Sequence, residues 1–117
     1  MITSLKENEI FIYGSNLAGI NAGGAAKYAQ DHFGAAKVGS GLSGKQCYAF
    51  PTLDKNFKQR TEKQLKQSVK TLYIWADRLK DFTFLLTPVG QGIAGYSKEF
   101  MEKLFVDMPK NIKKVNW

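Results

Sequence analysis

The feature that most constrains this chain is a short apolar run that passes into glycines and then into an alanine-rich stretch. It reads Phe11-Ile-Tyr-Gly-Ser-Asn-Leu-Ala-Gly-Ile-Asn-Ala-Gly-Gly-Ala-Ala26, which is typical of a strand, a glycine-rich turn and the start of a helix. Glycine lacks a Cβ atom, so its backbone N–H group can approach a ligand closely. The first turn of a helix adds unpaired N–H groups and the positive end of a dipole. The stretch therefore predicts an anion-binding loop, although the same glycines also suit a plain strand-to-helix turn.

A second glycine cluster has the same context. Thr87-Pro-Val-Gly-Gln-Gly-Ile-Ala-Gly-Tyr96 follows an apolar run and precedes a helical pattern. All 11 glycines of the chain fall within 14–44 or 90–95, whereas glycines that only form turns would be scattered over the connections. This distribution predicts two loops that serve one site.

Length and composition predict one compact domain spanning residues 1–117. With 117 residues and 44% hydrophobic content, the chain is large enough to bury one core. It contains no apolar run of about 18 residues, and its first residues lack the pattern of a signal peptide, so we expect a cytoplasmic protein without membrane contact. Cys47 and His32 are the only residues of their kinds, so we expect no disulfide, no metal site and no cofactor.

The net charge of +7 favours anionic partners such as nucleotides, phosphates or nucleic acid. Much of the positive charge lies in the segment 55–80. On a helix most of these lysines and arginines would form a solvated outer face. The alternative is a nucleic-acid-binding module that uses this basic segment.

Hydrophobic periodicity and capping signals predict strands alternating with helices. Thr61-Glu-Lys-Gln64 has the capping-box pattern and begins the clearest helix. Pro51 is expected to close a strand, Gly34 to stop the first helix and Ser97 to cap the last. The expected strands are 9–13, 46–50, 82–86 and 112–115, with a possible fragment at 2–5, and the expected helices are 21–33 (starting at Asn21 or Ala22), 61–79 and 97–106.

This order predicts an α/β fold in three layers, with a mainly parallel sheet and helices on both faces. Ligands of such sheets bind beyond the carboxyl ends of the strands. If the strands at 11–13 and 82–86 are neighbours, their glycine loops face each other across one crevice, spaced to bind two successive phosphates.

Other motifs are weaker. Gly39-Ser-Gly-Leu-Ser-Gly44 matches the dinucleotide-binding fingerprint by letter, and with Lys45 it nearly spells a mononucleotide loop. Both motifs require a helix to follow, whereas a strand is expected here, so a glycine-rich loop bordering the pocket is the better interpretation. His32 has no obvious nucleophile beside it, and Cys47 in an apolar strand is expected to be an inert core thiol.

Asn16 lies at the exit of the first strand, among glycines. Its amide can donate to one ligand hydroxyl and accept from another. The alternative is an asparagine that only supports the turn. Neither glycine loop contains a closely spaced carboxylate pair, which disfavours general acid and base catalysis.

These residues resemble the macro domain family, an ADP-ribose-binding α/β module. Tyr13-Gly-Ser-Asn16 with Gly23-Gly-Ala25 is similar to the family's first loop, and Gly92-Ile-Ala-Gly-Tyr96 to its second. The chain also looks like compact bacterial and phage proteins that have a strand ending in Gly-Ser-Asn-Leu-Ala-Gly. It departs from the family in having no Asp within 1–5 and no acidic residue between 14 and 30.

The resemblance implies binding of ADP-ribose or a related nucleotide diphosphate, with backbone amides on the phosphates and Asn16 on the distal ribose. Tyr96 or Phe50 is a candidate to stack on a ring. One alternative is hydrolysis of ADP-ribosyl or ADP-ribose phosphate derivatives, in which Asn16 would be catalytic by orienting the ribose. The expected ligand-binding residues are Gly14, Ser15, Asn16, Asn21, Ala22, Gly23, Gly24, Ala25, Val89, Gly90, Gln91, Gly92, Ile93, Ala94, Gly95 and Tyr96.

Overall fold

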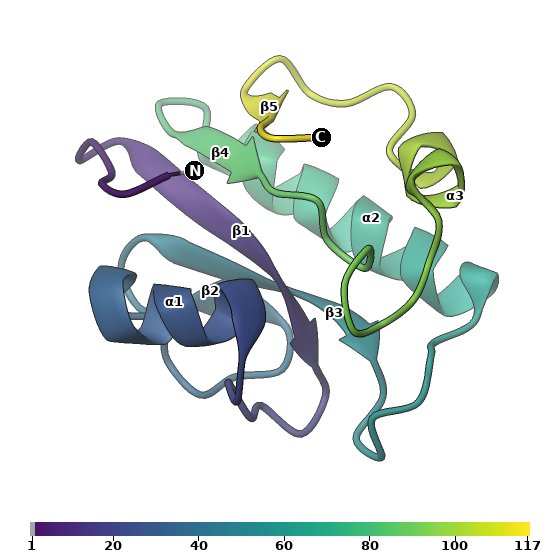
Figure 1. Ribbon diagram of the computed structural model, residues 1–117. Coiled ribbons are helices and arrows are strands. Elements are labelled where there is room, and N and C mark those ends of the chain that lie inside the picture. Colours follow the sequence, from purple (N-terminus) through teal and green to yellow (C-terminus); the bar gives the residue numbers. More distant parts are fainter. Residues whose placement is uncertain (1) are drawn as a thin grey trace.

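The computed structural model describes residues 2–117, which form one five-stranded sheet covered by helices on both faces. Figure 1 shows α1 in front of the sheet and α2 behind it. In chain order the elements are β1 (Glu9–Asn16), α1 (Gly24–Phe33), β2 (Gly41–Ser43), β3 (Cys47–Leu53), α2 (Glu62–Arg78), β4 (Thr83–Leu86), α3 (Lys98–Leu104) and β5 (Ile112–Lys114).

The strand order is β2-β3-β1-β4-β5. The central strand β1 runs parallel to both of its neighbours, β3 and β4, and β5 runs parallel to β4. Only β2, at one edge, is antiparallel to its neighbour. The predicted three-layer α/β fold is confirmed. The strands that lead into the two glycine loops, β1 and β4, are neighbours, which is the condition for the loops to face one crevice.

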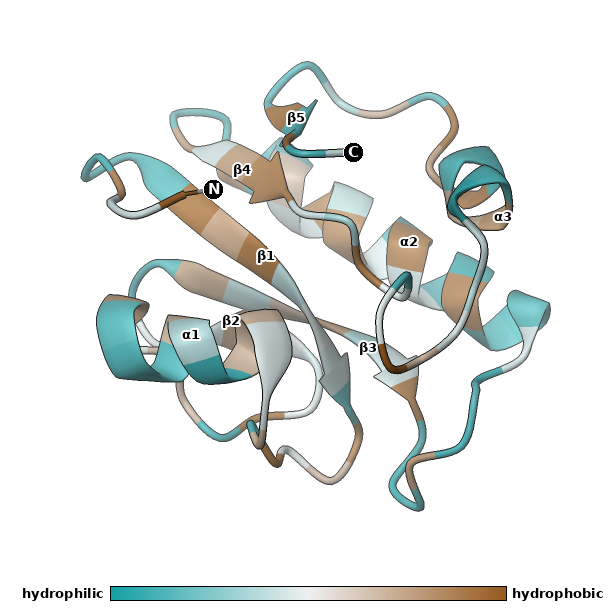
Figure 2. Cartoon of the chain, viewed as in Figure 1, coloured by the Kyte–Doolittle hydropathy of each residue, from teal (hydrophilic) through white to brown (hydrophobic). Residues whose placement is uncertain are grey.

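Alternating side chains of β1 divide the interior into two cores, as the period of two in a strand requires. Ile10 and Ile12 pack with α2 and α3 on one face. Phe11 and Tyr13 pack with Ala26 and Ala29 of α1 on the other. Figure 2 shows hydrophobic residues along β1 and β4, and alternating hydrophobic and hydrophilic stretches along α2. The sheet is therefore buried on both faces, as its apolar strands predict.

The residues predicted to cap or end the helices do so in the structure. Thr61 and Gln64 form the capping box, with Gln64 N donating to Thr61 Oγ1 over 3.2 Å and Thr61 N donating to Gln64 Oε1 over 2.9 Å. Ser97 caps α3 by accepting from Phe100 N over 3.1 Å. Gly34 ends α1 with a φ of 71°, in the left-handed region that favours glycine. Within residues 2–117, no helix has the length and apolar character needed to cross a membrane.

Two strands are longer than expected. β1 continues beyond Tyr13 to Asn16, because Gly14 and Ser15 keep pairing with Phe50 and Pro51 of β3. β3 likewise runs through Pro51 to Leu53, whereas the proline was expected to close it. β2 pairs only with residues 47–49, so β3 has a free edge at Pro51, where a missing N–H donor costs nothing.

The remaining differences concern short elements. The glycine-broken segment contains β2, where the buried Ser43 accepts from Ala36 N over 2.9 Å. Residues 2–5 do not form the expected strand fragment. α1 begins at Gly24, two or three residues later than expected, and α3 ends at Leu104 instead of Val106. Pairing and packing partners, which local sequence does not specify, decide these ends.

Candidate functional site

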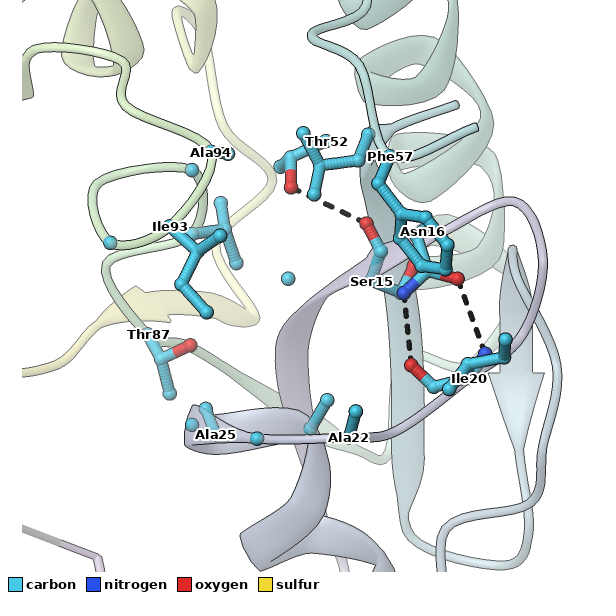
Figure 3. A pocket seen from close by; sticks show the side chains of 18 of the residues that line it. Ser15, Asn16, Ile20, Ala22, Ala25, Thr52, Phe57, Thr87, Ile93 and Ala94 are labelled. Atoms are coloured by element: carbon cyan, nitrogen blue, oxygen red, sulfur yellow. Dashed lines mark hydrogen bonds between the residues drawn. The ribbon is translucent and has the colours of Figure 1, made fainter. Parts of the chain in front are cut away.

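A cavity of ≈ 450 Å³ lies at the carboxyl ends of β1, β3 and β4 (Figure 3). This is the position expected for a ligand site in a parallel α/β sheet. Its volume falls within the range of small-molecule sites. The lining residues are Gly14, Ser15, Asn16, Ile20, Ala22, Gly23, Gly24, Ala25, Ala26, Thr52, Leu53, Phe57, Thr87, Pro88, Val89, Gly90, Gly92, Ile93 and Ala94.

The structure brings most of the expected ligand-binding residues into this lining. The two glycine loops meet at its base, because a Cβ added to Gly14 would lie only 3.5 Å from Gly90 N. This is an ordinary van der Waals distance, so the two loops are direct neighbours at this position. The expected residues that line the cavity are Gly14, Ser15, Asn16, Ala22, Gly23, Gly24, Ala25, Val89, Gly90, Gly92, Ile93 and Ala94.

Four expected residues lie outside the lining. Asn21 is buried, and its Nδ2 donates to Ala36 O over 3.1 Å and to Gln30 Oε1 over 3.2 Å. Gly95 has a φ of +77° and Gln91 buries its amide nitrogen. Tyr96 stacks on Phe100 with ring centroids 5.4 Å apart.

The second loop is fastened to the segment that precedes α2. Gln59 Nε2 donates to Ala94 O over 2.6 Å. Tyr96 Oη donates to Arg60 O over 2.6 Å, with Thr52 O at 3.2 Å. The position of the loop therefore depends on the connection between β3 and α2.

Two ring candidates fail to reach the cavity. Phe50 is 0% exposed and packs against Phe105 with ring centroids 5.2 Å apart, so its proposed stacking on a ligand is wrong. The ring of Tyr96 stacks on Phe100, and its hydroxyl is hydrogen-bonded to main-chain carbonyl oxygens. Both side chains are apolar or amphipathic members of the α2 and α3 core, which sequence alone does not distinguish from a stacking platform.

Main-chain N–H groups dominate the polar character of the cavity. At the start of α1, the N–H groups of residues 22–26 donate to no protein acceptor within the described chain, as expected for a first helical turn. In the second loop the same holds for Gly92, Ile93 and Ala94 among residues 2–117. Figure 3 shows Ala22 and Ala25 on one side of the cavity and Ile93 and Ala94 on another. Two sets of donors thus border one cavity.

Asn16 lines the cavity and also holds the first loop. Its Nδ2 donates to Ile20 O over 2.9 Å, and its Oδ1 accepts from Ile20 N over 3.2 Å. Figure 3 shows both bonds. One N–H and one lone pair of the amide are left over, so supporting the loop and contacting a ligand are compatible roles.

We expect Asn16→Ala to weaken ligand binding by about 0.5–1.5 kcal/mol, the value of one lost hydrogen bond. Calorimetric titration measures this loss, and thermal unfolding measures the separate loss of the two bonds to Ile20. Turnover abolished by Asn16→Ala with binding intact would instead make Asn16 catalytic.

No residue that lines the cavity in the described part of the chain carries an ionisable side chain. The hydroxyls are engaged with main-chain oxygens: Ser15 Oγ donates to Gly39 O over 2.6 Å, and Thr87 Oγ1 donates to Ile12 O over 2.6 Å. Two carboxylates on neighbouring segments lie outside the cavity lining. Asp31 pairs with Lys27 on the outside of α1, and the pKa of Asp54 is lowered by hydrogen bonds from the backbone N–H groups of its own loop.

The glycine-rich segment from Gly39 to Gly44 does not border the cavity, contrary to the sequence-based interpretation. It packs behind the first loop, where a Cβ at Gly39 would lie 2.8 Å from Leu17 Cα. A Cβ at Gly44 would lie 2.2 Å from Gly34 O. These glycines permit close chain packing. Cys47 is buried, and burial raises the pKa of its thiol to about 12, which fits an inert core residue.

A second, more apolar compartment adjoins the first. Its volume is ≈ 420 Å³ and it shares Gly24, Ala25, Thr87 and Pro88 with the larger cavity. Its remaining lining residues are Ile2, Phe11, Tyr28 and Asn116. This combination of chain ends was not foreseen, because only the fold brings residues near 2 and 116 together.

Sequence reasoning also missed the contribution of the β3–α2 connection. Thr52 and Leu53 at the end of β3 and Phe57 in the connection line the cavity, although no residue of 52–60 was among the expected ligand-binding residues. The available signal was Phe57, an isolated aromatic side chain in a polar loop.

The fold agrees with that of a solved macrodomain. The macrodomain of Mycobacterium tuberculosis DarG superposes with a TM-score of 0.66 and 18% sequence identity, over 94% of this chain and 88% of that one. This chain has a macrodomain-like fold. The resemblance seen in the sequence is thereby confirmed at the level of the fold.

A second similar structure is that of a Bacteroides thetaiotaomicron protein of unknown function. It matches with a TM-score of 0.55 and 12% identity, over 92% of this chain and 88% of that one. No family model matches the macrodomain-like chain, and no curated protein matches it in sequence. The likeness therefore lies in the backbone path.

Proposed function

We propose that the protein binds ADP-ribose or a closely related nucleotide diphosphate in the larger cavity. The observation that carries this proposal is the pair of main-chain donor sets, at residues 22–26 and 92–94, that border one cavity without any charged side chain. Free N–H groups at a helix start and in a glycine loop attract successive phosphates. The diphosphate lies between them, and Asn16 contacts the distal ribose.

The smaller compartment is assigned to the base. It opens from the phosphate cavity at Gly24 and Ala25, and it offers the rings of Tyr28 and Phe11. A nucleobase needs a flat apolar surface and a few polar groups, and the amide of Asn116 is one such group. An adenosine diphosphate thus spans both compartments.

The expected activity is binding with slow or absent turnover. A general base contributes typically 10²–10⁴-fold to a hydrolytic rate, and no ionisable side chain lines the cavity among residues 2–117. The alternative function is hydrolysis of ADP-ribosyl or ADP-ribose phosphate derivatives, assisted by the ligand's own phosphate. Robust release of ADP-ribose from a mono-ADP-ribosylated protein would favour that alternative.

A thermal-shift titration tests the proposal. A ligand at 100 times its dissociation constant adds about 2.7 kcal/mol to the free energy of unfolding, which for a domain of this size corresponds to roughly 10 °C in Tm. We expect such a shift with ADP-ribose. No shift with ADP-ribose, ADP, NAD or cyclic nucleotides would contradict the site.

Salt dependence separates this site from nucleic-acid binding by the basic segment 55–80. The lysines of α2 do not line the cavity, and Lys66 is paired with Glu62. Contacts with a phosphate backbone release counterions, so the affinity of such a complex falls steeply with salt. We expect the affinity for ADP-ribose to change little between about 50 and 200 mM salt, the range over which complexes with a phosphate backbone lose affinity steeply.

A further inference from the structure

Three large apolar side chains stand exposed around the opening of the cavity, and the proposed function uses none of them. Ile20 is 50% exposed, Phe57 is 52% exposed and Ile93 is 91% exposed. All three line the cavity, and they come from three different loops. Exposed apolar groups gathered at a polar opening mark a contact surface, whereas single scattered ones need no explanation.

Phe57 is held in place by a closed turn. Asp54 Oδ1 accepts from Asn56 N over 2.8 Å and from Lys58 N over 3.0 Å. Asp54 N donates to Lys58 O over 2.8 Å, and Phe57 N donates to Asp54 O over 3.1 Å. The ring is thus presented by a turn whose backbone is hydrogen-bonded on both sides.

The backbone of Phe57 adopts a left-handed conformation, with a φ of 62°. Glycine and asparagine occupy this region easily, whereas a bulky aromatic residue there is strained. A strained aromatic side chain that lines a cavity is a sign of a functional contact. The phenyl ring, and not only the turn, is therefore the feature that needs an explanation.

The location of Phe57 indicates what it contacts. Figure 3 shows Phe57 on the same side of the cavity as Asn16, and Ile93 on the opposite side. In the proposed function Asn16 contacts the distal ribose, so Phe57 lies next to whatever that ribose carries. A flat ring placed between an aromatic and an aliphatic side chain removes apolar surface from water on both of its faces.

We infer that the opening of the cavity is a subsite for a planar heteroaromatic ring attached to the distal ribose, so that the ligand class is a dinucleotide of the NAD type. This inference rests on the proposed function, because it takes the diphosphate and distal ribose positions from it. Phe57 stacks on one face of the ring and Ile93 covers the other. The cavity lining has no side-chain acid or base within residues 2–117 to cleave the glycosidic bond, so the dinucleotide is bound intact.

The test compares NAD with ADP-ribose, which lacks the ring, on the full chain. Calorimetric titrations use the parent protein and Phe57→Gly, a variant that removes the ring and relieves the strained φ, so that folding is preserved. Ile74→Ala, at a site on α2 that is 53% exposed and outside both compartments, is the matched control for loss of an exposed apolar side chain. Chromatography of the titrated NAD checks that it stays intact.

We expect the parent protein to bind NAD at least as tightly as ADP-ribose. Loss of one aromatic stacking contact corresponds to roughly tenfold in affinity, so Phe57→Gly is expected to weaken NAD binding by about that factor. The same substitution is expected to change ADP-ribose affinity by less than about twofold, because ADP-ribose makes no stacking contact, and Ile74→Ala is expected to change neither.

Two results would overturn the inference in different ways. If ADP-ribose binds but NAD is rejected, or if Phe57→Gly affects both ligands equally, the ring subsite is wrong and the proposed function stands. If neither ligand binds the parent protein, the proposed function itself fails and the subsite fails with it.

Discussion

A Gly23→Asp variant is expected to fold as stably as the parent protein and to lose about a hundredfold or more in affinity for ADP-ribose. Gly23 is the N-cap of α1, with an extended φ of −168° and no atom within 4 Å of an added Cβ. Any residue therefore fits its backbone, and an aspartate there caps the helix better than glycine by a few tenths of a kcal/mol. Its carboxylate takes up the N–H groups assigned to the diphosphate and repels the ligand, at a cost of several kcal/mol.

Calorimetric titration measures the affinity, and urea unfolding confirms that the variant is folded. Gly23→Ser is the neutral counterpart, which competes for the same N–H groups without charge, so it should fall between the parent protein and Gly23→Asp. Ser97→Asp places a carboxylate at the N-cap of α3, outside both compartments, and should leave affinity unchanged. Full affinity in a folded Gly23→Asp protein would mean that the start of α1 does not bind the phosphates. Gly24 is less suitable for this test, because its φ of +58° strains any side chain.

Gly44→Ala is expected to destabilise the protein by about 3 kcal/mol, from left-handed strain together with a buried steric clash. Gly44 has a φ of +68°, and its added Cβ would lie 2.2 Å from the carbonyl oxygen of Gly34. That oxygen belongs to the backbone that ends α1, so it has little freedom to move. The clash forces the turn between β2 and β3 away from the end of α1.

Urea unfolding measures this effect, and Gly41→Ala in the same segment provides the control. Gly41 has a φ of +95° but no atom within 4 Å of an added Cβ. Its substitution therefore reports backbone strain alone, about 1–2 kcal/mol. Equal decreases in the free energy of unfolding of the two variants would show that the Gly34 carbonyl moves at little cost. The contact at Gly44 would then not restrict this part of the fold.

Local signals in the sequence predicted the architecture well. Three predicted features depend only on neighbours along the chain, and all three are present in the structure. They are the capping box at Thr61, the helix end at Gly34 and the apolar strand before Thr87. Parallel strands meet with their carboxyl ends at one edge, so these local assignments placed both glycine loops at that edge, and the pairing of β1 with β4 brings them together.

Features decided by distant partners were not predictable in the same way. Pro51 remains in a strand because β2 pairs only with residues 47–49 of β3. The N–H group that proline lacks is therefore not required for pairing with β2. The glycines at 39 and 44 resemble a nucleotide motif by letter, but they serve the packing of one chain segment on another. Phe57 lines the cavity because its loop is directed toward it, and the local sequence does not specify that direction. In each case the relevant neighbour lies in another element or loop, or its direction depends on tertiary packing.

The cavity wall consists largely of peptide groups and small residues, and this has a consequence for how far the sequence around it can vary. A peptide N–H group is the same whichever side chain its residue carries, so substitutions can accumulate as long as the backbone keeps its course and a few crowded positions remain glycine. The macrodomain of Mycobacterium tuberculosis DarG has the same fold, with a TM-score of 0.66 at 18% sequence identity. Cavities of this kind are therefore better compared by the path of the main chain around them than by the residues that line them.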